Sequence, residues 1–144
     1  MKISILHKVY SSLFAVVIAS IFVVCANAQR VDEAAIKKTI DFYSDYKDLP
    51  SSLTCKPPAS QAEKIICADP LLRLMERLDT MASIYMVENG THRELSHNKR
   101  TVMQESSIKT IRKLKTAAAI RKAYIKSTND ALGGESPYYV KEDK

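Results

Sequence analysis

Residues 55–70 read Cys-Lys-Pro-Pro-Ala-Ser-Gln-Ala-Glu-Lys-Ile-Ile-Cys-Ala-Asp-Pro, and this stretch decides the fold because it places two helix starts close together. Ser60 and Glu63 have the spacing of a capping box, in which each side chain bonds a free backbone N–H of the other residue. Asp69 before Pro70 is a second start signal, since Asp caps a helix and Pro fits its first position. The stretch predicts a short helix over residues 61–67, a sharp change of chain direction, and a longer helix from residue 70.

The first 28 residues have the layout of a cleaved secretory signal peptide. Lys2 and Lys8 make the start basic, residues 9–24 form an almost uncharged apolar run, and Ala26-Asn27-Ala28 is a small-x-small cleavage site. Lipidation of Cys25 and retention of the apolar run as a membrane anchor are the alternatives. We favour cleavage, which predicts a periplasmic or secreted protein with no transmembrane anchor in the mature chain.

The two cysteines of the deciding stretch are expected to form a disulfide. Cys25 leaves with the signal peptide, so Cys55 and Cys67 are the pair that remains in an oxidising compartment. Redox pairs usually have two intervening residues, whereas eleven lie between these. No cluster of His or acidic residues completes a zinc site around them. Closing a loop of this size stabilises the fold by roughly 3 kcal/mol in the chain-entropy model.

The mature chain is small and mildly basic. The full sequence has 144 residues, with 22 Lys+Arg and 16 Asp+Glu. Removing residues 1–28, which hold Lys2 and Lys8 but no acidic residue, leaves 116 residues and a net charge of +4. That length supplies one small hydrophobic core and not two. We therefore expect one domain.

Helical periodicity recurs on both sides of residues 55–70. In residues 31–46 apolar positions return every three or four residues, which predicts an amphipathic helix, and the three prolines of residues 47–60 predict a loop. The helix from Pro70 is expected to run to about Glu88 and to end at Asn89-Gly90. Its expected core face comprises Leu71, Leu74, Met75, Leu78, Met81, Ala82 and Tyr85.

The second half of the chain predicts more helix and no strand. Residues 91–99 are expected to be a loop or a frayed helix start, with Asn98 or Thr101 as the cap of the next helix. No Gly or Pro lies between Lys113 and Ala119, so one long helix and two shorter helices are both open over residues 99–132. The apolar positions of this part are Val102, Met103, Ile108, Ile111, Leu114, Ala118, Ile120, Ala123, Tyr124 and Ile125.

The fold class expected from these patterns is all-α, a small disulfide-stapled helical bundle after a cleaved signal peptide. Residues 29–54 form the N-terminal helix and loop, and residues 55–132 form the main helical domain. Gly133-Gly134 ends the helical part, and residues 133–144 are expected to be a flexible tail.

Acidic and histidine residues give no catalytic or metal site in this reading. Glu63 and Asp69 are assigned to helix caps, and Glu76 and Asp79 fit a polar helix edge near two arginines. His92 and His97 lack the carboxylate or cysteine partners of a metal site, and no Gly-rich phosphate loop or triad is present. We expect no enzyme, no cofactor and no metal.

A run of basic residues over 109–126 is the candidate binding surface. Such a run grips phosphate, anionic lipid or peptidoglycan acids, but it is also typical of the solvated face of a packed helix. Nucleic acid is not expected, because the chain is exported and has no groove-reading motif. The candidate binding residues are Lys109, Arg112, Lys113, Arg121, Lys122 and Lys126.

The chain resembles the LprI-like lysozyme inhibitor family, small exported helical proteins. The resemblance rests on Cys55, the run Glu63-Lys64-Ile65-Ile66-Cys67, the pair Asp69-Pro70 and the leucines through Leu72. A weaker similarity extends to about Leu132. It includes Gln104, Ile108, Arg112 and the run from Ile120 to Tyr124.

The resemblance implies a disulfide-stapled helical fold in the periplasm or at the cell surface, with lysozyme inhibition as the named activity. Many members have a Trp and a second cysteine pair in the later helices. Here Ser107 and, approximately, Leu114 and Ala119 stand in those places, so the second staple is absent. Glu76 and a displaced Tyr85 replace an Asp and a Tyr of the family pattern, and no inhibitory residue carries over.

Charge bears on the partner that the resemblance implies. Animal lysozymes are strongly cationic, so a chain at +4 is repelled at long range unless a local acidic patch dominates. We expect an exported, non-enzymatic interaction protein that inhibits lysozyme or another cell-wall hydrolase. The alternative is an envelope-associated helical protein that binds a polyanion or an anionic surface through its basic C-terminal helices.

Overall fold

The computed structural model describes residues 31–46, 49, 51–133 and 138. These residues form five α-helices and one short 3₁₀ helix, with no β-strand among them. The expected all-α fold with a Cys55–Cys67 disulfide is therefore confirmed. The expected signal peptide at residues 1–28 lies outside the described residues.

The first helix is shorter than the periodicity predicted. α2 spans Glu33–Phe42, and η1 spans Ser44–Tyr46. Asp32 begins α2, because its Oδ1 accepts hydrogen bonds from the backbone N–H groups of Ala34 and Ala35 at 2.8 and 3.3 Å. α2 buries Ile36 completely against the core.

Both helix starts of the deciding stretch are where the sequence placed them. α3 spans Gln61–Ala68, and the Ser60 hydroxyl accepts from the Glu63 N–H at 3.1 Å. α4 spans Pro70–Thr91, and Asp69 Oδ1 accepts from the N–H groups of its first turn. The Glu63 carboxylate bonds other partners, described below, so the second half of the expected capping box is replaced.

The end of α4 differs from the expectation of a stop at Asn89-Gly90. The helix continues to Thr91, and His92, with φ of 51°, adopts the left-handed conformation that closes it. The N–H of Arg93 bonds the carbonyl of Glu88 at 3.2 Å. Helix termination by this turn makes Gly90 an ordinary exposed position of the last turn, which a helix tolerates at a modest cost.

The second half of the chain forms two helices. α5 spans His97–Ile111 and α6 spans Ala117–Ala131. Ser96 precedes α5, where we expected Asn98 or Thr101, and its side chain makes no capping hydrogen bond. Thr116 caps α6 through a hydrogen bond of 3.2 Å from the Ala119 N–H. This cap explains how a new helix begins after α5 although no Gly or Pro separates the two helices.

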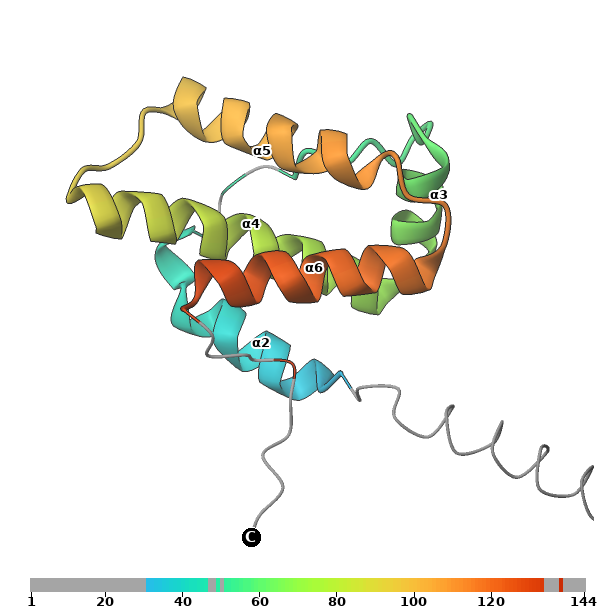
Figure 1. Ribbon diagram of the computed structural model, residues 1–144, viewed down its shortest axis with the longest axis horizontal. Coiled ribbons are helices and arrows are strands. Elements are labelled where there is room, and N and C mark those ends of the chain that lie inside the picture. Colours follow the sequence, from blue (N-terminus) through green and yellow to red (C-terminus); the bar gives the residue numbers. More distant parts are fainter. Residues whose placement is uncertain (1–30, 47–48, 50, 134–137, 139–144) are drawn as a thin grey trace, which may run out of the picture. The chain divides into compact units, whose positions relative to one another are not determined.

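α4 is the central helix of the fold (Figure 1). It packs most extensively against α6 and also contacts α2, α3 and α5. Because several elements cover it, α4 buries residues around much of its circumference rather than along one stripe. The expected Leu71, Leu74 and Tyr85 are only partly buried. Those fully or almost fully buried on α4 are Leu72, Met75, Glu76, Leu78, Asp79, Thr80, Met81, Ala82 and Ile84.

Tyr138 lies in the segment that we expected to be a flexible tail, and the structure differs from that expectation there. Tyr138 is completely buried and belongs to the hydrophobic core. Its hydroxyl lies 3.0 Å from the hydroxyl of Thr128 on α6. Residues 134–137 and 139–144 lie outside the described part of the chain. Within the part described, no helix combines the length and apolar character needed to cross a bilayer.

Candidate functional site

The acidic residues expected at a polar helix edge are instead buried. Glu76 is 6% exposed and Asp79 is 1% exposed, and Glu63 on α3 is not exposed at all. A buried carboxylate requires hydrogen bonds or a cation, since its desolvation is costly. Each of these acids finds its partners within the chain.

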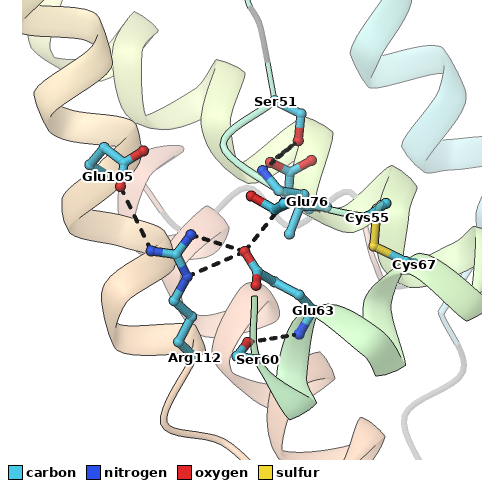
Figure 2. A network of polar contacts seen from close by, with 10 residues as sticks. Ser51, Cys55, Ser60, Glu63, Cys67, Glu76, Glu105 and Arg112 are labelled. Atoms are coloured by element: carbon cyan, nitrogen blue, oxygen red, sulfur yellow. Dashed lines mark hydrogen bonds and ion pairs between the residues drawn. A yellow bond between two sulfur atoms is a disulfide. The ribbon is translucent and has the colours of Figure 1, made fainter. Parts of the chain in front are cut away.

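Glu63 binds the end of α5 (Figure 2). Its Oε1 accepts from Arg112 Nη2 at 3.0 Å, from Arg112 Nε at 3.2 Å and from the Thr54 N–H at 3.3 Å. Burial by itself raises the pKa of Glu63, but the hydrogen bonds from Arg112 and Thr54 and the charge of Arg112 outweigh it and hold that pKa below its ordinary value. Glu63 is therefore a carboxylate paired with a guanidinium.

Glu76 binds the loop before α3. Its Oε1 accepts from the Ser51 hydroxyl at 3.1 Å. Burial raises the pKa of Glu76, and the Ser51 hydrogen bond and the charge of Arg77 only partly oppose this effect. Arg77 itself donates to the backbone carbonyls of Leu49 and Tyr46. Glu76 and Arg77 thus tie this loop and η1 to α4.

Asp79 lies between three elements. It accepts from the Ser107 hydroxyl of α5 at 3.4 Å and from the Thr128 hydroxyl of α6 at 3.2 Å. Thr128 in turn contacts the Tyr138 hydroxyl. Burial raises the pKa of Asp79, and hydrogen bonds from Ser127, Thr128 and Ser107 offset part of the rise.

Glu88 anchors the turn between α4 and α5. Its Oε1 accepts from the Leu95 N–H at 2.8 Å and from Arg100 Nε at 2.9 Å, and its Oε2 accepts from the Tyr46 hydroxyl at 3.0 Å. Burial raises the pKa of Glu88, but these hydrogen bonds bring it below its ordinary value. Burial and the bond to Glu88 raise the pKa of Tyr46 to about 12.

These contacts show how α5 is attached. Arg100, Ser107 and Arg112 on or at the end of α5 meet Glu88, Asp79 and Glu63 respectively. Arg100, Gln104 and Ser107 follow at helical spacing, but polar residues occur all around this helix, so the sequence carries no distinct signal for the attachment. We read the apolar residues of this helix as its inner face, and Val102 is instead 68% exposed.

The six candidate cations do not form one free surface. Arg112 is bound to buried Glu63, and Lys126 forms an ion pair of 2.5 Å with Asp130. Arg121 is partly buried, and its Nε has no hydrogen-bond partner among the described residues. Lys109 and Lys113 near the end of α5 and Lys122 on α6 are exposed.

The surface is hollowed at the corner where α4 turns into α5. One hollow of about 550 Å³ is lined by Asp45, Leu49, Glu94, Leu95, Ser96, His97 and Arg100. A second hollow of about 330 Å³ is lined by Leu95, Asn98, Lys99, Val102 and Met103. The two hollows meet at Leu95. We call this surface the corner; it combines exposed carboxylates with an apolar patch, and no periodic pattern of the sequence predicts it.

The structure adds no metal ligands around the histidines. Over the described residues, no group of three or more His, Cys, Asp or Glu side chains is placed to hold a metal ion. His92 is the exposed residue that closes α4, and His97 lines the first hollow. Both histidines are exposed, and His97 is the first residue of α5.

Comparisons with family models, with curated proteins and with solved structures found no match to this chain.

Proposed function

We propose that the protein is an exported, non-enzymatic interaction module that inhibits lysozyme or a related cell-wall hydrolase, and that it is a divergent relative of the LprI-like inhibitors. The motif from Cys55 to Pro70 supports the family proposal. Its cysteines form the disulfide, and α3 and α4 begin within it. Export is supported by the signal-like N-terminus and by the disulfide, which is typical of oxidising compartments.

The use of the buried carboxylates supports a binding rather than a catalytic role. Glu63, Glu76, Asp79 and the partly buried Glu88 each bond residues that hold loops and helices in place. A general acid or base must reach the substrate in a cleft, and these four side chains face neighbouring elements instead. A partner is therefore expected to bind exposed residues of the surface rather than these four side chains.

The corner is the observation that carries the proposal. Val102 is 68% exposed beside Leu95 and Met103, and an apolar patch bordered by polar residues is typical of a protein-binding site. The adjoining hollow carries the carboxylates of Asp45 and Glu94. Asp45 and Glu94 are the carboxylates that a cationic hydrolase would meet there, and Arg100 lines the same hollow and pairs with Glu94 at 3.2 Å.

Inhibition of lysozyme tests this function directly. We expect the purified protein to slow lysis of bacterial cell walls when it is titrated against the enzyme, and V102D to weaken inhibition at least about tenfold, because it places a carboxylate in the apolar contact. The control is A118D, which puts the same side chain at an exposed position of the first turn of α6, where an acid is compatible with the helix. Absence of inhibition at micromolar protein would remove the proposal.

Polyanion binding is the second candidate, favoured by three exposed lysines for which no ion pair is formed within the described residues: Lys109, Lys113 and Lys122. In the same titration, an inhibitory effect that acts through a polyanion on the cell wall falls steeply as salt rises. It is also lost when these lysines are changed together to Gln. Inhibition that survives the lysine changes and depends on Val102 supports the corner instead.

A further inference from the structure

A short segment covers two of the buried carboxylates. Residues 51–58, which we call the strap, run from Ser51 to the start of α3 (Figure 2). At one end the Ser51 hydroxyl donates to Glu76, and at the other the Thr54 N–H donates to Glu63. The strap therefore closes the side of the molecule on which Glu63 and Glu76 are buried.

The strap buries little surface of its own. Ser51 and residues 54–58 are exposed, and Leu53 is only partly buried against the core. Its covalent attachment is the disulfide between Cys55 and Cys67 in α3, with Cα atoms 5.8 Å apart. Few apolar contacts oppose the lifting of such a segment, so the disulfide is its main fastening.

Glu63 connects the strap to α5. The same oxygen, Oε1, accepts from Thr54 of the strap and from Arg112 at the end of α5. The other oxygen, Oε2, is buried with no hydrogen-bond partner among the described residues. When the strap lifts, water reaches this carboxylate, and the ion pair with Arg112 weakens because charges attract less in water.

We propose that the Cys55–Cys67 disulfide is a redox-sensitive latch whose reduction frees the strap and loosens the C-terminal end of α5. The reductant is a dithiol. One thiolate attacks the sulfur of exposed Cys55 and expels Cys67 as a thiolate, and the second thiol then displaces Cys55 and closes a cyclic disulfide. Two electrons pass from the dithiol to the protein disulfide, and the two cysteines take up the two protons that the dithiol releases.

Hydrogen exchange of the whole protein tests the latch. We expect reduction with excess dithiothreitol to raise amide exchange at residues 53–55 and 108–112 about tenfold or more, while the amides of α4 around Met75 and Leu78 keep their protection. A second measurement follows circular dichroism of the reduced protein, which we expect to keep its helical signal. Unchanged exchange at residues 108–112 overturns the proposal, and so does cooperative loss of protection throughout the chain.

Two oxidised variants separate the route through Glu63 from general loosening. R112Q removes the pairing at α5, so we expect it to raise exchange at residues 108–112 before any reduction, with no further rise there after reduction. S51A removes the bond to Glu76 and the bond that the Ser51 hydroxyl accepts from the Leu53 N–H, and it is expected to leave residues 108–112 at the level of the unmodified protein. If S51A raises that exchange as much as R112Q does, the connection through Glu63 is wrong.

Discussion

Asp79 is a buried acid that bonds residues of two other helices. It is 1% exposed, and its hydrogen bonds come from hydroxyl groups of Ser107 and Thr128 rather than from a cation. A buried carboxyl group in this setting is easier to hold protonated than ionised. Burial raises the pKa of Asp79, and this shift determines how the contribution of Asp79 to folding stability depends on pH.

Replacement of Asp79 by Asn should reduce the dependence of stability on pH. A carboxyl group whose folded pKa is raised stabilises the fold most below its unfolded pKa, and that contribution is lost as pH rises through the folded pKa. Asn keeps the size and the ability to bond hydroxyl groups. We expect D79N to match the unmodified protein near neutral pH or exceed it, and to show a flatter profile in urea unfolding between about pH 4 and 8.

Glu63 serves as a control for Asp79, because its pKa is shifted in the opposite direction. Its pKa is lowered in the fold, so its contribution is present above the unfolded pKa and is lost as pH falls through the folded pKa. E63Q should therefore cost about 1.5–3 kcal/mol near neutral pH and progressively less in acid. A large loss of stability in D79N at neutral pH, similar to that in E63Q, would mean that Asp79 is required as an anion.

Local signals made some of these residues predictable and left others hidden. Ser60 and Asp69 cap helices through backbone groups two or three positions away, so their roles could be predicted from spacing. Glu76 and Asp79 lie near Arg73 and Arg77 in sequence, which suggested a solvated edge. Their burial depends on how α5, α6 and the strap cover α4, and no local pattern encodes that arrangement.

Among the helices, α5 has two distinct sides. The inner side combines the polar contacts to buried acids with two buried apolar residues, Ile108 and Ile111. The outer side carries Val102 with no packing role in the fold. Apolar residues therefore occur on opposite sides of α5, so they do not mark a single buried face of this helix.

Truncation of one residue from each side of α5 should separate these roles. Ile111 is 5% exposed, so I111A should cost roughly 2–5 kcal/mol by leaving a cavity, whereas V102A should change stability by less than about 0.5 kcal/mol. Thermal and urea unfolding of both variants measure the difference. Equal destabilisation by the two changes would contradict the orientation of α5.

The boundary between α5 and α6 shows the limit of turn signals. The sequence has no Gly or Pro over residues 113–119, and the question of one helix or two was open. Thr116 provides the missing signal, because its hydroxyl caps α6 just as Ser60 caps α3. The Asn89-Gly90 signal predicts an end of α4 that is too early. The helix continues to Thr91, where His92 and the hydrogen bond from the Arg93 N–H to the Glu88 carbonyl close it.

Taken as a bundle, the described chain is organised around α4 (Figure 1), and one disulfide within it joins Cys55 to Cys67. The helical class could be predicted because helix caps and apolar periodicity agree along most of the sequence. The corner could not, because its two hollows bring together η1, the turn after α4 and the start of α5. Tyr138 likewise returns to the core from a segment whose composition suggested a tail.

Binding at the corner is the central claim, and NMR mapping tests it most directly. Unlabelled lysozyme is titrated into the ¹⁵N-labelled protein, and amide shifts are followed residue by residue. We predict that the largest changes cluster at Glu94, Leu95 and Val102, and that V102D abolishes them while A118D leaves them intact. Changes confined to Lys109, Lys113 and Lys122, or no changes at all at a few hundred micromolar lysozyme, would contradict the claim.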